Sequence, residues 1–377
     1  MAIGTGRPHE ELRSLLADEI MPTHRDRWGD SHEWEALVDF QRQLGKHGWT
    51  APAWPIEIGG RGLDVEELVA CESVFHELSA PTRVAVYGVN NVGPTIAAVG
   101  TPEQKEHLRA IVEVDELWCQ GFSEPDHGSD LAGLQCRAER DGDEFVVNGQ
   151  KIWTSIGLGA THCMLLVRTD PGAPKHKGIS ALLVPLDLPG IERRAIVQIT
   201  GEKEFAELFF TDVRVPTTAL LGPENEGWRV TMTTLGYERS GILSMAGSIA
   251  SDAEHLIAEL GRGRGLHGPI LQRAMAVYSR ARLLRITGQR SLASEGDVPG
   301  PLSTLIKQEF AALMKDVAAL AVDTAGPSGQ LHDGPGATRD FLRSPATGIA
   351  GGTTEVLKNL IGERVLGLPK EPQAPGS

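Results

Sequence analysis

The hydrophobic pattern of this chain changes twice along its 377 residues, and this change restricts the folds that it can adopt. Apolar residues recur at helical spacing up to about residue 117 and again from about residue 227. Between these points, short apolar runs alternate with turns rich in glycine and proline, as in a small all-β domain. The order predicts an α+β protein with a helical domain at 1–117, a β domain at 118–226, a second helical domain at 227–368 and a disordered tail at 369–377.

Helical spacing in the first domain predicts helices at 10–20, 34–44, 64–78 and 101–112. Asp64 or a neighbour can cap the third of these. The fourth begins with Thr101, Pro102 and, three residues after the threonine, Gln104, which is the pattern of a capping box.

In the middle domain, Asn148-Gly149 lies between two β-forming runs, 144–147 and 150–155, which predicts a hairpin with a type I′ turn. Further strands are predicted at 163–168, 179–185 and 207–211. Apolar stripes in the last domain predict helices at 228–257, 269–294, 301–325 and 354–366.

Charge and cysteine content limit the partners of the chain. A net charge of −14 disfavours binding to nucleic acid or anionic lipid. The four cysteines form no CxxC pair, which predicts free thiols in a reducing cytoplasm and no metal site. The uncharged stretch 84–102 contains asparagines, glycines and a proline that favour a buried, broken helix over a membrane span. The N-terminus turns acidic too early for a signal peptide. We therefore expect a cytoplasmic protein.

Two polar segments carry the candidate chemistry. The loop WCQGFSEPDHGSDLAGL at 118–134 offers backbone N–H groups and hydroxyls to an anion or a polar heterocycle. The segment QKIWTS at 150–155 places a tryptophan beside two hydroxyl residues, which suits stacking and hydrogen bonding to a flat ligand. Taken singly, the first is better explained as an ordinary loop joining two domains and the second as a core tryptophan at a sheet edge.

Together these segments resemble the acyl-CoA dehydrogenase family. The family's TEPxxGSD loop corresponds to SEPDHGSD at 123–130, and its NGxKxWIT/S segment to NGQKIWTS at 148–155. The resemblance continues through PGI at 189–191, FTDVRVP at 210–216, LLGPENEGW at 220–228 and GGTTEVLKNLIGERVLG at 351–367. It spans roughly residues 8–368.

The resemblance implies an N-terminal helical domain, a middle β-barrel-like domain, a C-terminal four-helix bundle, and FAD held between the last two. Phe122, Ser123, Gly128 and Ser129 would then lie along the flavin and pyrophosphate, with Ser129 also near the thioester. Trp153 and Ser155 would pack against and bond the isoalloxazine ring. The cofactor set expected from the resemblance is completed by Gln120, Thr154, Thr353 and Glu355.

The reaction of the family needs a carboxylate base. Many members carry it near the C-terminus, where this chain has Gly351. Isovaleryl-CoA and long-chain dehydrogenases instead carry it on a bundle helix within L-x-x-E-R, which matches 235–239 here and assigns Glu238 as the base. Arg239 corresponds to a position that contacts CoA, and Tyr237 is placed with it in the substrate site. A surface ion pair is the alternative interpretation of Glu238-Arg239, although apolar neighbours favour a desolvated face.

Gly351 is assigned a second catalytic role by the resemblance. In the family, the backbone N–H at this position helps polarise the thioester carbonyl. Any residue other than proline supplies that donor, so glycine keeps this role and loses only the side chain. One such donor is worth ~2.7–4 kcal/mol of transition-state stabilisation.

Two departures from the family concern the adenine end of FAD. The family's RxxFG segment is shortened here to GRGRG at 261–265, and its Q-x-x-GGxG stretch becomes DTAGPSG at 323–329. These groups reach FAD across a subunit interface in the family. Either the chain forms a homotetramer with altered contacts, or it needs a paralogous partner, as do the α2β2 steroid side-chain dehydrogenases of actinobacteria that it resembles.

The expected function is FAD-dependent α,β-dehydrogenation of an acyl-CoA thioester to the trans-2-enoyl thioester. Electrons would pass to an electron-transfer flavoprotein or a similar acceptor. Two alternatives stand beside it: a non-catalytic subunit that completes the FAD site of a paralogue, and an acyl group carried on a carrier protein instead of CoA.

Overall fold

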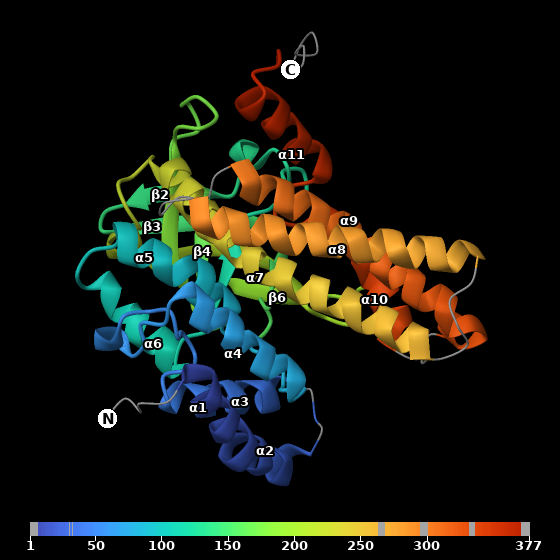
Figure 1. The fold of residues 1–377 in the computed structure, drawn as a ribbon. Helices are drawn as coiled ribbons and strands as arrows, with labels where there is room; N and C mark the ends of the chain where they lie inside the picture. The colour runs from blue at the N-terminus through green and yellow to red at the C-terminus, as the bar shows by residue number, and fades with distance from the viewer. Residues whose placement is uncertain are drawn as a thin grey trace. The chain divides into compact units, whose positions relative to one another are not determined.

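The computed structural model describes residues 7–29, 31, 33–262, 268–294, 301–331 and 336–370, without the side chains of 65, 238–246, 248, 292–294 and 301. Two compact units divide the chain, Met1–Val197 with Lys203–Thr234, and Gln198–Glu202 with Leu235–Ser377. The predicted order of helical, β and helical segments is confirmed (Figure 1). The domain boundaries at 118 and 227 stay a prediction, and residues 371–377 of the predicted tail lie outside the described residues.

The first unit begins with helices, most of them where the apolar spacing predicts them. They are α1 (Pro8–Leu15), α2 (Met21–Trp28), α3 (Trp34–Lys46), α4 (Val65–Glu77), α5 (Gly93–Val99) and α6 (His107–Glu113). Asp64 caps α4 through a capping box with Glu67. The predicted break within 84–102 is present as the π-helical turn Gly88–Val92, which runs directly into α5.

The helix predicted at 101–112 begins late. Thr101 and Gln104 do form the reciprocal bonds of a capping box. However, a 3₁₀ turn, Gln104–Glu106, follows, and α6 starts only at His107. The Gln104 amide also donates to the carbonyls of Thr218 and Leu220, 2.9 and 3.0 Å away. This side chain therefore ties the turn to a segment more than 100 residues away, a contact that local spacing does not reveal.

Seven strands follow and form one mixed sheet. They are β1 (Trp118–Gly121), β2 (Arg137–Asp141), β3 (Glu144–Ser155), β4 (His162–Arg168), β5 (Ile179–Pro185), β6 (Ile191–Ile196) and β7 (Phe205–Pro216). The order is β1-β4-β2-β3-β7-β6, with β5 paired to β4. Only the β1–β4 pair and a single β2–β4 bridge are parallel.

Strand β4 is buried on both faces, which explains its uninterrupted apolar run. Cys163, Leu165 and Val167 pack in a core with residues of β3 and β7. Met164 and Leu166 face the other way and pack with apolar residues of α5 and α6. Helices α5 and α6 therefore share a core with the sheet, whereas α1, α3 and α4 pack in a core of their own.

The hairpin predicted at Asn148-Gly149 is wrong. Strand β3 continues through these residues, and the reversal lies earlier, between β2 and β3, where Gly142 has a φ of +62°. Asn148 and Gly149 instead form a bulge opposite β7, and the Asn148 side chain bonds Asp212. A Cβ on Gly149 would lie 2.7 Å from Cys136 Cα, so this glycine is required by a close approach of two strands.

The second unit is helical. It holds most of α7 (Gly227–Arg262), with α8 (Gly268–Ser294), α9 (Pro301–Ala325), α10 (Gly336–Arg343) and α11 (Thr354–Leu360). Helices α8 and α9 lie side by side (Figure 1). Small residues on α7 and α8, such as Ala253 and Ala281, pack with Phe310 and Leu313 of α9 in a common core. The three long helices predicted here are confirmed.

We predict that Gly149→Ala destabilises the protein by about 1–3 kcal/mol, because the added methyl group meets the Cys136 backbone and the residue keeps a φ of +149°. Urea unfolding measures the change. Gly288→Ala is the matched control, since a Cβ there, inside α8, meets nothing within 4 Å. An equal stability of the two variants would contradict the close approach.

Candidate functional site

The loop after β1 is held to strand β3 by a buried ion pair. Lys151 Nζ lies 2.7 Å from Glu124 Oε1, and the two side chains are 0% and 6% exposed. The Glu124 carboxylate also accepts bonds from the backbone N–H groups of Gln135 (2.7 Å) and Cys136 (2.8 Å). The lysine donates in addition to the Phe122 carbonyl at 3.2 Å. Four charge-assisted bonds thus fix both ends of the loop to one point on the sheet.

The pKa of Glu124 lies below its ordinary value. Burial acts to raise it, but the Lys151 ammonium and the two backbone donors outweigh burial. A carboxylate whose folded pKa is depressed stabilises the fold above its unfolded pKa of about 4.3. That contribution is lost as the pH falls through the lower folded pKa.

The same contacts bring the two predicted segments together. The Ile152 N–H donates to the Ser123 carbonyl at 2.9 Å, beside the Lys151 bond to Phe122. The 122–124 backbone therefore runs along β3 at 151–152. Gly128 and Ser129, further along the loop, are exposed.

Strand β3 ends in a distortion that turns Trp153 outward. The pairing register with β7 shifts between Lys151 and Thr154, and Trp153 has a φ of +59°. A positive φ is unfavourable for a bulky residue and marks local strain. Trp153 is 56% exposed and meets Phe205 edge to face, with ring centroids 5.9 Å apart. An exposed indole on a strained strand end is a ready surface for a flat aromatic ligand.

Two of the predicted cofactor-binding residues carry a buried polar atom that has no hydrogen-bond partner among the described residues. They are the Thr154 hydroxyl and the side-chain nitrogen of Gln120. Gln120 uses its oxygen to accept from Asn91 at 3.0 Å. Because buried polar groups are nearly always bonded, two such atoms fit a ligand that supplies the partners. These residues, with partly buried Ser155, match the chemistry that a flavin ring requires.

The remaining predicted residues belong to the second unit. Gly351 is exposed with a φ of +66°. Thr353 caps α11 by accepting from the Val356 N–H at 3.2 Å, and Glu355 is exposed in the first turn.

Three predicted residues lie on α7 within the second unit. Tyr237 is partly buried, whereas the side chains of Glu238 and Arg239 lie outside the described residues. Their roles therefore stay predictions. The same holds for residues 263–265 of the shortened GRGRG segment.

Asp323 replaces a glutamine of the family and is already engaged. Its carboxylate forms an ion pair with Arg273 of α8. Both side chains are about half exposed, so this is a surface pair worth less than ~1 kcal/mol.

Sequence reasoning quoted Glu124 and Lys151 within the two motifs but gave them no role. The ion pair could have been predicted, because one acidic and one basic residue lie on two segments that are expected to meet. Because charged side chains are rarely buried alone, a mutual pair was the physical expectation.

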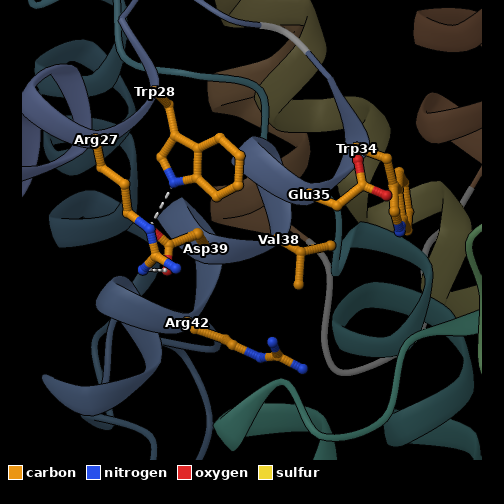
Figure 2. Close-up of a pocket in the computed structure, with 7 residues that line it drawn as sticks. All are labelled: Arg27, Trp28, Trp34, Glu35, Val38, Asp39 and Arg42. Carbon is orange, nitrogen blue, oxygen red and sulfur yellow. Dashed lines mark hydrogen bonds and ion pairs between the residues drawn. The ribbon is translucent and has the colours of Figure 1, made fainter.

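Two surface hollows lie elsewhere in the first unit and border Trp34. One, of about 340 Å³, lies between α2 and α3 (Figure 2). There Asp39 accepts from Trp28 Nε1 (3.0 Å) and Arg27 (3.1 Å), so its carboxylate is already satisfied. The second, of about 410 Å³, has His162 and Asp187 in its wall. None of the predicted site residues lines either hollow.

None of the helices described is long and apolar enough to cross a membrane.

Three domain families match consecutive parts of the chain. The acyl-CoA dehydrogenase N-terminal domain matches residues 8–113, the middle domain residues 119–213 and the C-terminal domain residues 225–366. Acyl-CoA dehydrogenase IpdE1 of Mycobacterium tuberculosis is 37% identical over 378 residues, covering 96% of this chain and 97% of its own.

Solved structures with the same fold include two whose names each join two proteins. The Tcur3481–Tcur3483 steroid ACAD has a TM-score of 0.84 at 29% identity, covering 98% of this chain and 100% of that one. The ChsE4–ChsE5 complex from Mycobacterium tuberculosis has a TM-score of 0.82 at 30% identity, with coverages of 98% and 100%.

We predict that Lys151→Met destabilises the protein by about 3–5 kcal/mol, because it leaves the buried Glu124 carboxylate without its cation. Denaturant unfolding at neutral pH measures the loss. Lys175→Met is the control, since it breaks the pair with Asp130, in which both side chains are 54% exposed, and should cost less than ~1 kcal/mol. Adding Glu124→Gln to Lys151→Met should recover part of the stability, and equal losses in the two lysine variants would contradict the assignment.

Proposed function

This chain belongs to the acyl-CoA dehydrogenase family, and from that premise we propose that it oxidises the Cα–Cβ bond of an acyl-CoA thioester to the trans-2-enoyl thioester, with FAD as hydride acceptor and Glu238 as base. Family membership makes the chain an acyl-CoA dehydrogenase, an oxidoreductase. The observation that carries the finer proposal is the exposed Trp153 next to the buried, unpartnered hydroxyl of Thr154.

The residues that would hold FAD are those of the first-unit loop and strand end. Trp153 offers a face for the isoalloxazine ring, while Thr154, Ser155 and Gln120 offer hydrogen bonds to its polar edge. Ser123, Gly128 and Ser129 offer hydroxyls and backbone N–H groups to the remainder. When bound, FAD supplies a ring that accepts a hydride. The Glu124–Lys151 pair acts as a positioning element, because it fixes the loop that carries these groups.

The α proton of the substrate would be taken by a side chain of the protein and not by FAD. Glu238 on α7 would take it from the α carbon, and this requires its carboxylate to be ionised and desolvated. Arg239 and Tyr237, its neighbours on the helix, would contact the CoA portion. A backbone N–H from Gly351 would bond the thioester oxygen, which makes the α proton more acidic. The absence of a side chain at Gly351 leaves room for a base from α7.

The substrate class that we favour is a bulky acyl-CoA of the steroid side-chain type. The support is the likeness to a structure described as a steroid ACAD, at 29% identity and a TM-score of 0.84. Electrons would pass to an electron-transfer flavoprotein or a similar acceptor.

A mixed assembly with a paralogue is favoured over a homotetramer by two observations. Asp323 replaces the family's glutamine, and a carboxylate cannot donate the hydrogen bonds that an amide donates. The solved relative ChsE4–ChsE5 is a complex of two chains. Because this chain keeps the flavin-facing loop and a base, we assign it the catalytic part. A non-catalytic scaffold, lending contacts to a paralogue, is the second candidate.

We predict that Glu238→Gln lowers kcat by at least ~100-fold and leaves flavin absorbance unchanged, because the amide cannot accept the α proton. Turnover with an artificial electron acceptor and the visible spectrum of the purified protein measure the two properties. Glu259→Gln, an exposed carboxylate on the same helix, is the control and should keep full activity. Normal turnover by Glu238→Gln would refute the base assignment.

We also predict that the chain purified with its paralogue contains more flavin than the chain purified alone. Visible absorbance per polypeptide and the mass of the assembly measure this, followed by bleaching of the flavin with a panel of straight-chain, branched and steroid-type thioesters. Carrier-protein thioesters in the same panel test whether the acyl group is carried on a protein instead of on CoA. Full flavin content and bleaching in the isolated chain would establish a homo-oligomer, and bleaching that survives Glu238→Gln would assign the chemistry to the partner.

A further inference from the structure

Three potential metal ligands to which the proposed function assigns no role converge in the first unit. They are His107, Glu116 and His162, and their ligand atoms all lie within 4.8 Å of one another. His107 Nδ1 lies 2.8 Å from Glu116 Oε2, and His162 Nε2 lies 3.8 Å from Glu116 Oε1. The three come from separate elements: the start of α6, the segment before β1 and the start of β4.

Neighbouring groups orient these ligands. Trp118 Nε1 donates to Glu116 Oε2 at 3.0 Å, and its ring stacks on His162 with centroids 4.9 Å apart. The Thr161 hydroxyl lies 2.9 Å from His162 Nδ1, which leaves Nε2 toward the carboxylate. Histidines that bind metals typically engage their second nitrogen in this manner, because the bond sets the ring orientation and the tautomer.

The cluster is reachable from solvent. His162 and Thr161 lie in the wall of the hollow of about 410 Å³, together with the carboxylate of Asp187. The side chains of His107, Glu116 and His162 are 29%, 16% and 19% exposed. An ion could therefore enter, and water could complete its coordination.

We propose that His107, Glu116 and His162 form a binding site for a divalent transition metal of the zinc class. Ligands at the usual ~2.0–2.1 Å from a tetrahedral zinc lie about 3.4 Å apart. The two histidine–glutamate pairs are separated by 2.8 and 3.8 Å, and all three ligand atoms lie within 4.8 Å of one another, so small side-chain shifts would close the set on an ion. Two imidazoles and one carboxylate also match the ligand types that zinc prefers. The ion would join α6 to β1 and β4, so its role is to brace the junction of helices and sheet.

Isothermal titration of the chelator-treated full-length protein with zinc chloride tests the site. We expect one zinc per chain and a higher melting temperature with zinc. Glu116→Gln should weaken binding at least ~10-fold, because it removes the charged ligand while its amide oxygen can still accept from Trp118. His107→Gln is the second variant, since it leaves the Glu116–Trp118 bond intact and should weaken binding equally.

His255→Asn is the matched control. His255 Nε2 lies 3.3 Å from Glu259 on α7, but this pair is exposed and no third ligand joins it among the residues that the structure describes, so its loss should leave zinc affinity unchanged. Thiols do not compete, because all four cysteines are buried and burial raises the pKa of Cys71 and Cys136 to about 11. Absence of zinc binding in the parent protein, or unchanged binding in both Glu116→Gln and His107→Gln, would reduce the cluster to a hydrogen-bonded network and overturn the proposal.

Discussion

The buried pair of Glu124 and Lys151 is the interaction on which the rest of the site depends. Two charges removed from water are tolerated only when they neutralise one another and when the remaining lone pairs are bonded, which the Gln135 and Cys136 N–H groups achieve. Because the lysine points inward from β3 and the glutamate comes from the loop after β1, the pair fixes the distance between this loop and β3. Trp153, two residues beyond Lys151, is turned outward from that fixed point.

Much of this fold could be predicted from periodicity and from local capping chemistry. Asp64 caps α4 as the sequence predicts, with Glu67 completing a capping box, and the run 179–185 is a strand with the predicted bounds. Asn148-Gly149 shows where such reasoning stops. Its turn propensity is real, but Asp212 and Cys136, which are distant in sequence, hold it in a continuous strand. Tertiary contact overrides local preference there, as it does at Gln104.

Part of the candidate site could likewise be predicted from the sequence, and part of it could not. Motif spacing found Trp153, Thr154 and the loop at 122–129, and the structure places residues 122–124 of that loop along the strand that carries Trp153. It could not reveal that Thr154 and Gln120 carry unpartnered atoms, because hydrogen bonding depends on the whole fold. Glu238 is assigned as base because the reaction needs a carboxylate and Gly351 cannot supply one. This argument comes from the chemistry of the reaction and not from the spacing of apolar residues along a helix. The cluster of His107, Glu116 and His162 is spread over 56 residues and shows no ligand spacing in the sequence.

The burial of all four thiols has a practical consequence for the study of this protein in solution. Cys71, Cys119, Cys136 and Cys163 lie in the cores of the first unit, and burial raises the pKa of Cys119 as well. Alkylating reagents need a thiolate that they can reach, so they should modify the native protein only as fast as its cores open. The rate at which the four native cysteines are alkylated would therefore measure how often these cores open. A single cysteine engineered on the surface would react with a fluorophore or spin label much faster than the native thiols.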